Sequence, residues 1–275
     1  MQHGGLDPAE FLAGDGRTRR TLLTASLLMM SGVVQSAQVP KDEPLKIGVD
    51  ANYPPYSFYD DNRHLTGLDP SLAREAGRRA GVVPTFVPIA WDRKNELMAT
   101  GRIDCVWSCF SINGREDRYL WIPYLYSRQV VAVQKTSSIR TVADLEGKTV
   151  ALQSGTRPET FFMQDPKAPQ VTELIALPST AEAFIAVRRG YADAVAGHEA
   201  VLQRLIKEVP GAYRVLDEPL LAVKVGVAFP LNSQKTELIK RLGTAMANMA
   251  REGVIERLAS AYGLDGGKVV MMPAD

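Results

Sequence analysis

Two stretches of the chain repeat the same order of sequence signals. NELMATGRIDCVW (95–107) and EAFIAVRRGYADAVA (182–196) each combine an apolar-faced helical pattern, a glycine, an aspartate and a short apolar run. A glycine after the last periodic residue is typical of a helix end, and the apolar run is typical of a buried strand. The repetition predicts an α/β fold with two similar lobes, each a mainly parallel sheet flanked by helices.

The remaining elements continue this alternation. Strands are predicted at 45–49, 85–89, 105–107, 149–152, 171–177, 193–196 and 223–229. Helices are predicted to open with Asp69 as N-cap, at Asp92, at Thr156, and with capping-box spacing from Ser179 to Glu182, and to follow at 233–251 and 254–262. If the last helices return to the first lobe, two chain crossings connect the lobes as a hinge. We therefore expect lobe 1 at 45–133 plus 226–263, lobe 2 at 134–225 and a tail at 264–275.

The N-terminus predicts export. Arginines at 17, 19 and 20 precede a 14-residue apolar stretch (21–34), and small residues follow up to Ala37. This pattern is typical of a signal peptide over residues 1–37, and the stretch is shorter than the roughly 20 residues that span a membrane. TRRTLLT (18–24) also resembles a twin-arginine signal, so both export routes stay open. We expect the mature protein in the periplasm.

Composition and cysteine spacing exclude other classes. The net charge of +1 gives no signal for nucleic acid as a partner. Cys105 and Cys109 are the only cysteines. An extended chain separates their Cα atoms by about 13 Å, too far for a disulfide, so free thiols are predicted. His198-Glu199 resembles the start of a zinc-protease motif, but Leu202 stands where the second histidine would be needed. We expect no metal and no cofactor.

Ligands of open α/β sheets bind beyond the carboxyl ends of strands. That rule selects polar and aromatic residues in five stretches: 50–58, 90–92, 108–116, 153–159 and 197–199. Arg115 offers a planar fork for a carboxylate, and Thr156 begins a helix whose free N–H groups favour an anion. Tyr53, Tyr56 and Trp91 could wall the apolar part of a ligand or simply pack within lobe 1.

The ordered series resembles the extracytoplasmic solute-binding proteins of ABC importers, in the polar amino-acid-binding family 3. The series comprises IGVDANYPPYSF, TGLD, AWD, GRIDCVWSCFSINGR, PYLYSRQVVAV, ADLEGKTVALQSGT and GYADAVAG, within 45–262. The resemblance implies two lobes that close on a small ligand, a membrane permease as partner, and a monomer. It implies ligand contacts for Asp50, Tyr53, Tyr56, Trp91, Ser108, Cys109, Ser111, Arg115, Thr156, Arg157 and His198, with Arg115 as the carboxylate clamp.

Three positions depart from the family pattern. Asn113 and Arg115 are one residue closer than usual, which leaves Arg118 as a second candidate for the clamp. Cys109 replaces a small polar residue or glycine, although its backbone N–H could still contact the ligand. At 198 the family typically carries an aspartate that binds the α-ammonium of the ligand. His198 cannot supply a fixed negative charge.

The departure at 198 leaves the ligand open. Either Glu199 replaces the missing acid, or the amino group is bound weakly, or the ligand has none. Arg115, Arg157 and a protonated His198 would favour an acidic ligand, whereas Asp50 would favour a basic one.

The main hypothesis is a binding protein with no catalytic group. A dehydratase on the same fold is less favoured, since Val201 stands where such enzymes would carry an acid. A sensor that docks on a membrane receptor is the third alternative.

Overall fold

The computed structural model describes residues 43–272 of the chain. The predicted signal peptide, residues 1–37, lies outside this range, as do residues 273–275. Within the described part, no helix is both long enough and apolar enough to cross a bilayer.

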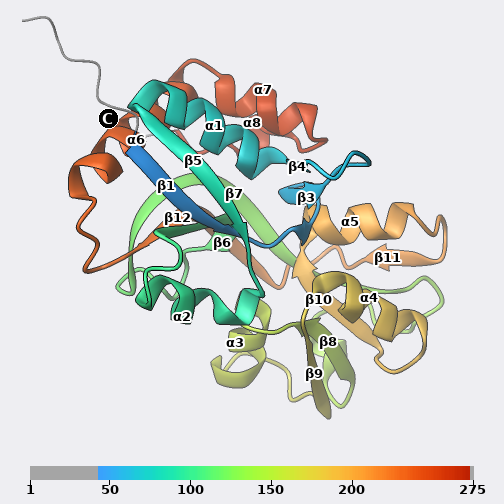
Figure 1. The fold of residues 1–275 in the computed structure, drawn as a ribbon. Coiled ribbons are helices and arrows are strands. Elements are labelled where there is room, and N and C mark those ends of the chain that lie inside the picture. Colours follow the sequence, from blue (N-terminus) through green and yellow to red (C-terminus); the bar gives the residue numbers. More distant parts are fainter. Residues whose placement is uncertain (1–42, 273–275) are drawn as a thin grey trace, which may run out of the picture. The chain divides into compact units, whose positions relative to one another are not determined.

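One sheet of nine strands runs through the described chain (Figure 1). Its order is β5-β1-β6-β12-β7-β10-β8-β9, with β11 paired to β7. The strands are β1 (Glu43–Val49), β5 (Val82–Pro88), β6 (Cys105–Ser111), β7 (Tyr119–Gln134), β8 (Thr149–Gln153), β9 (Glu173–Leu177), β10 (Ala194–His198), β11 (Tyr213–Val215) and β12 (Leu221–Pro230). A smaller sheet contains β2 (Asn52–Tyr53), β3 (Ser57–Tyr59) and β4 (Leu65–Thr66).

Two long antiparallel strands divide the large sheet. On one side β1 pairs in parallel with β5 and β6, and on the other β8 pairs in parallel with β9 and β10. Between them, Leu221–Pro230 of β12 lies opposite Tyr119–Gln129 of β7, with one irregularity at Val225/Gly226. The fold is therefore the expected two-lobed α/β architecture, with lobe 1 on the β1 side, lobe 2 on the β8 side, and β7 and β12 joining them. The predicted lobe boundaries stay predictions.

Helices cover the sheet on both sides of this junction. They are α1 (Leu68–Ala80), α2 (Lys94–Ala99), α3 (Arg157–Gln164), α4 (Thr180–Arg188), α5 (Glu199–Lys207), α6 (Thr236–Arg251), α7 (Val254–Ala261) and α8 (Gly266–Val269), with 3-10 turns at Trp91–Arg93 and Ala143–Leu145. Helices α6 and α7 pack on α1 (Figure 1), where Leu242 and Met246 share one buried core with Leu72 and Ala76. The C-terminal helices thus return to lobe 1. The predicted tail also contains structure, because α8 packs on the same lobe.

Local signals at helix ends are mostly confirmed. Gly81 ends α1 in the left-handed conformation, and Ser179 caps α4 by accepting a hydrogen bond from the Glu182 N–H at 3.2 Å. The prediction that Asp69 caps α1 is wrong, since the helix begins at Leu68 after Gly67. The Asp69 side chain is instead buried and accepts hydrogen bonds from Tyr124 Oη and from the Cys109 N–H, both at 2.7 Å.

Several strands differ from the sequence-based expectation. The long strand β7 and the short strands β4 and β11 were not predicted. The strand predicted at 105–107 continues to Ser111, with all of its residues buried, and the short strands β2 and β3 begin within 50–58. Both cysteines of β6 are free thiols, as predicted.

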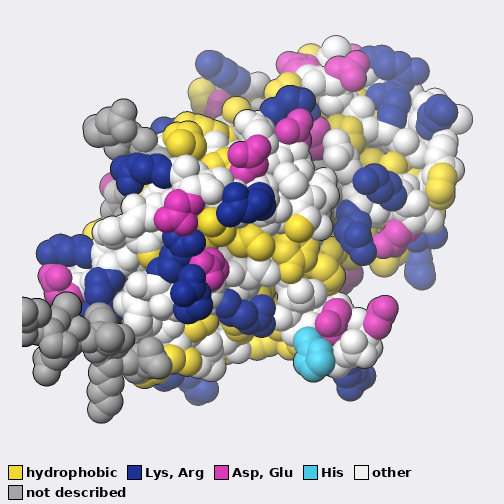
Figure 2. Space-filling view, turned by 90° about the horizontal axis from the view of Figure 1, so that it is seen from above, with side chains coloured by type: hydrophobic (Ala, Val, Ile, Leu, Met, Phe, Trp, Pro, Cys, Tyr) yellow, Lys and Arg dark blue, Asp and Glu magenta, His cyan; other side chains and the backbone are white. Residues whose placement is uncertain are grey.

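Charges of both signs are interspersed on the surface. Over the face that Figure 2 shows, basic side chains lie beside acidic ones. Ion pairs such as Arg79 with Glu252, at 2.7 Å, illustrate the pattern. This distribution agrees with the net charge of +1. The absence of a nucleic-acid partner stays a prediction.

We predict that Gly67→Ala destabilises the protein by roughly 3 kcal/mol or more, because both the backbone conformation and the space require glycine. Gly67 has φ 117°, and an added Cβ would lie 2.4 Å from the Tyr56 carbonyl oxygen. Gly101→Ala is the matched control, since Gly101 has φ 67° but no atom within 4 Å of an added Cβ. It should cost only about 1 kcal/mol. Chemical denaturation measures both free energies, and equal losses would contradict the packing at Gly67.

Candidate ligand-binding site

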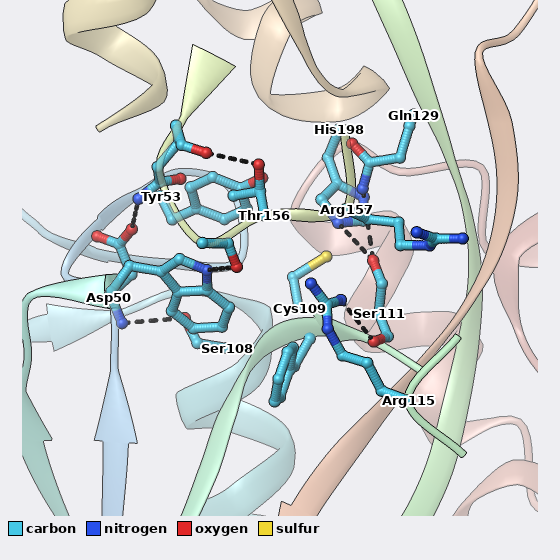
Figure 3. Close-up of a pocket in the computed structure, with 14 residues that line it drawn as sticks. Asp50, Tyr53, Ser108, Cys109, Ser111, Arg115, Gln129, Thr156, Arg157 and His198 are labelled. Atoms are coloured by element: carbon cyan, nitrogen blue, oxygen red, sulfur yellow. Dashed lines mark hydrogen bonds between the residues drawn. The ribbon is translucent and has the colours of Figure 1, made fainter. Parts of the chain in front are cut away.

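A cavity lies where the carboxyl ends of β1, β6, β8 and β10 meet (Figure 3). It contains about 310 Å³ of atom-free space, open solvent included. The predicted site residues that line it are Asp50, Tyr53, Trp91, Ser108, Cys109, Ser111, Arg115, Thr156, Arg157 and His198. Their contact with a solute stays a prediction.

Tyr56 is the predicted site residue that does not line the cavity. The chain turns back between β2 and β3, which leaves Tyr53 at the cavity and Tyr56 in the core with 1% of its surface exposed. The two rings stack with their centroids 6.0 Å apart, and Tyr56 also meets the edge of His198 at 6.0 Å. Tyr56 thus supports the aromatic wall from behind.

Four lining residues were not predicted: Phe110, Gln129, Gln153 and Gly155. Phe110, Gln153 and Gly155 belong to stretches selected by the rule that ligands bind beyond the carboxyl ends of strands. Neighbouring residues in those stretches were chosen as candidates instead. Gln129 lies within β7, away from any strand end. Its one sequence signal is a polar residue beside the apolar run VVAV.

Asp50 provides the carboxylate of the cavity. Its Oδ2 accepts a hydrogen bond from Gln153 Nε2 at 2.7 Å, across the two lobes, and its Oδ1 accepts one from the Asn52 N–H at 3.0 Å. Burial raises the pKa of this carboxyl, and the two hydrogen bonds act in the opposite direction. Asp50 is therefore held in place before any solute arrives.

Two guanidinium groups provide positive charge on the other side. Arg115 Nη1 donates to the Ser111 carbonyl at 3.2 Å, and the Arg115 guanidinium lies 5.2 Å from the centre of the Phe110 ring. Burial, and then the nearby Arg157, lowers the pKa of Arg115 to about 10. Arg157 lies against the Gly114 turn, and its buried Nε has no hydrogen-bond partner among the described residues. Neither arginine has a carboxylate within ion-pair distance in the described part of the chain.

His198 ends β10 and is buried between two serines. Its Nε2 lies 3.3 Å from Ser111 Oγ and its Nδ1 lies 2.8 Å from Ser127 Oγ. Burial lowers the pKa of His198 to about 3, so the imidazole is neutral at pH 7. Of the two protonation states that the sequence left open, this environment favours the neutral one, because a buried imidazolium would lack a counter-charge.

Glu199 does not replace the missing acid. Its carboxylate accepts a hydrogen bond from Arg128 Nε at 2.8 Å, and both residues line a separate groove rather than the cavity. The first residue of α5 points away from the cavity because β10 ends at His198. A solute in the cavity therefore meets neutral groups at this end of β10.

Two further hydrogen bonds join the lobes along the part of the cavity that Trp91 and Gly155 line. Trp91 Nε1 donates to the Gly155 carbonyl at 3.3 Å, and Lys94 Nζ donates to the same oxygen at 3.1 Å. Lys94 is 4% exposed, and burial lowers its pKa to about 8. Trp91 packs edge-on against Phe110, with ring centres 5.2 Å apart. These contacts close the cavity along one side.

The backbone of Cys109 is used within lobe 1. Cys109 has a φ of 48°, and its N–H donates to Asp69 Oδ2 at 2.7 Å. This N–H is therefore already bonded within lobe 1, and a contact between Cys109 and a ligand stays a prediction. The described residues contain no group of three or more His, Cys, Asp or Glu side chains placed to hold a metal ion.

We predict that stability falls on acidification through His198. The unfolded imidazole titrates near 6.5 and the folded one near 3. The unfolded chain binds more protons between these values, so the stability is present above pH 6.5 and is lost as the pH falls toward 3. Between pH 7 and pH 5 the natural protein should lose roughly 1–2 kcal/mol more than His198→Gln, measured by denaturation.

Burial raises the pKa of Asp69 to about 7, so this carboxyl stabilises the folded state on acidification. The natural protein and His198→Gln share that contribution. The difference between them therefore isolates His198. Equal losses on acidification would contradict the neutral, buried imidazole.

Comparison with known proteins gives the family. Residues 45–265 match the sequence model of the bacterial extracellular solute-binding proteins, family 3. The histidine-binding periplasmic protein of Salmonella typhimurium (strain LT2) is 30% identical over 256 residues, which cover 89% of this chain and 96% of that protein. The L-cystine-binding protein of Escherichia coli (strain K12) is 28% identical over 222 residues, 79% of this chain and 82% of that protein.

A solved structure agrees with these sequence matches. Tv2483 bound to L-arginine superposes with a TM-score of 0.73 at 25% identity, covering 80% of this chain and 90% of that one. The family match extends from β1 to the residue before α8, and so includes both lobes and the cavity between them. The chain belongs to family 3 of the bacterial extracellular solute-binding proteins.

Proposed function

We propose that this protein is the periplasmic solute-binding component of an ABC importer. It captures a small polar solute, an amino acid, between its two lobes. The similar proteins are named for histidine and cystine, and the similar structure holds L-arginine. These solutes differ in their side chains and share an α-amino group beside a carboxylate. The shared part is what a common site would recognise.

The observation that carries the proposal is the unpaired guanidinium of Arg115. A half-buried charge without an ionic partner is costly, and a carboxylate would compensate it through two parallel hydrogen bonds. Arg115 lies at the cavity beside Phe110 and Ser111, and the Thr156 end of α3 lines the same cavity. The solute carboxylate would therefore bind between lobe 1 and lobe 2.

Closure of the lobes follows from the same arrangement. Strands β7 and β12 are the connections on which a rotation would occur, and hinge closure around a ligand is a common device. The Trp91 and Lys94 bonds to Gly155, together with the Asp50 bond to Gln153, would hold the closed form. That closed form is the state we expect a permease to receive.

A dehydratase function has no observation in its favour. Val201, at the position where an acid would be needed, is 1% exposed and belongs to the apolar core. A valine there cannot transfer a proton. Capture and delivery of a solute require no such group.

We predict that Arg115→Ala weakens solute binding by about 30- to 1,000-fold, because a charge-assisted, partly buried pair contributes roughly 2–4 kcal/mol. Calorimetry of the mature protein with L-histidine, L-arginine and L-cystine measures the change. Arg118→Ala is the matched control, since Arg118 is exposed and does not line the cavity. Loss of binding in Arg118→Ala, with Arg115→Ala unchanged, would contradict the assignment.

A further inference from the structure

Gln129 is a buried polar residue whose hydrogen-bonding capacity is only partly used. It lies in β7, lines the cavity and is 1% exposed. Its Nε2 donates to Ser111 Oγ at 3.4 Å, but its Oε1 has no partner among the described residues. A buried acceptor without a donor costs free energy, so such an atom in a cavity indicates a group that arrives with the ligand.

The neighbouring hydrogen bonds define which atom of Gln129 is free. Ser111 Oγ lies 3.4 Å from Gln129 Nε2 and 3.3 Å from His198 Nε2. The amide nitrogen of Gln129 faces Ser111 Oγ, which can accept its hydrogen whether the serine donates to His198 or accepts from it. The amide oxygen is therefore the atom left without a partner among the described residues.

His198 has no ring nitrogen left for a solute. Its Nδ1 is 2.8 Å from Ser127 Oγ and its Nε2 is 3.3 Å from Ser111 Oγ, so each ring nitrogen already has a serine partner. Gln129 and His198 lie side by side above Ser111 in Figure 3. The acceptor available at this end of the cavity is therefore Gln129 Oε1.

The carboxylate of the cavity lies elsewhere. Asp50 appears on the opposite side from Gln129 in Figure 3, where it is bound to Gln153 and to the Asn52 N–H. Asp50 is the acidic residue among those that line the cavity in the described part of the chain. Among the described residues that line the cavity, none therefore places a fixed negative charge beside Arg115, Ser111 and His198.

We propose that Gln129 Oε1 receives the amino group of the solute, so that this cavity recognises the group through a neutral acceptor rather than a carboxylate. The inference rests on the proposed function, because it needs a solute with an amino group next to its carboxylate. A hydrogen bond from an ammonium to a neutral acceptor is only about twice as strong as one from a hydroxyl, a much smaller difference than at a carboxylate. The protein therefore accepts 2-hydroxy acids together with the amino acids whose side chains they share.

Matched solute pairs test this inference by calorimetry on the mature protein. The pairs are L-histidine with imidazolelactate, L-arginine with argininic acid, and L-aspartate with L-malate. In each pair only the amino group changes, to a hydroxyl. We expect the Kd values within any bound pair to differ by about tenfold or less. A carboxylate anchor would instead separate them by about a hundredfold or more, since the buried acid would lose its charged partner.

Substitutions at 129 give opposite expected shifts. Gln129→Glu adds a negative charge and should raise the preference for the amino acid to about a hundredfold. Gln129→Leu removes the acceptor and should weaken amino-acid binding at least tenfold. Gln134→Leu is the matched control, because Gln134 lies on the same strand but is exposed and outside the cavity. It should change neither Kd.

Several outcomes would overturn the inference while binding through Arg115 persists. One is a large amino-acid preference in the natural protein that Gln129→Leu leaves unchanged. Another is weaker amino-acid binding in Gln129→Glu, which would show that the amide nitrogen faces the solute. A third is a large preference for the amino acid in the natural protein that disappears in Asp50→Asn, which would place the amino group at Asp50. Absence of binding by both members of every pair would overturn the proposed function together with this inference.

Discussion

The antiparallel pairing of β7 with β12 is the constraint on which the rest of the structure depends. Leu221–Pro230 lies opposite Tyr119–Gln129, and this ladder places β6 on one side and β10 on the other. The carboxyl ends of strands from both lobes then face one cavity. Gln129 itself pairs with both Leu221 and His198 along the backbone. The junction between the lobes is thus also one wall of the site, and a change of lobe orientation would alter that wall directly.

The polar groups of the cavity are of two kinds. Some already have hydrogen-bond partners within the protein, and others lack a hydrogen-bond or charge partner there. Asp50 is bonded to Gln153 and to a backbone N–H, and His198 is bonded to two serines. Arg115 and Arg157 have no carboxylate partner among the described residues, and Gln129 Oε1 has no donor there. The satisfied groups hold the walls, whereas the unsatisfied ones define what a solute must bring. A carboxylate and a hydrogen-bond donor on adjacent atoms meet both needs, and an amino acid carries them.

Strand periodicity and the rule about carboxyl ends were enough to predict most of the residues that line the cavity. Asp50, Ser108, Thr156 and His198 all lie where predicted strands end. Long-range partners were not predictable in the same way. Asp69 has the local signature of a helix cap, yet its partners are Tyr124 and Cys109, residues 55 and 40 positions away. The one local signal of Gln129, a polar residue beside an apolar run, does not reveal its role, which depends on the register between β7 and β10. Tyr56 was misplaced because a two-strand turn separates it from Tyr53, three residues earlier, and places the two rings in different surroundings.

The most direct test of this account is a crystal structure of the mature protein with L-histidine or L-arginine bound. We expect the solute between the lobes, with a carboxylate oxygen about 3 Å from the Arg115 guanidinium and the amino nitrogen about 3 Å from Gln129 Oε1. A solute whose carboxylate lies away from Arg115, or whose amino group is held by Asp50 with Gln129 uninvolved, would contradict it.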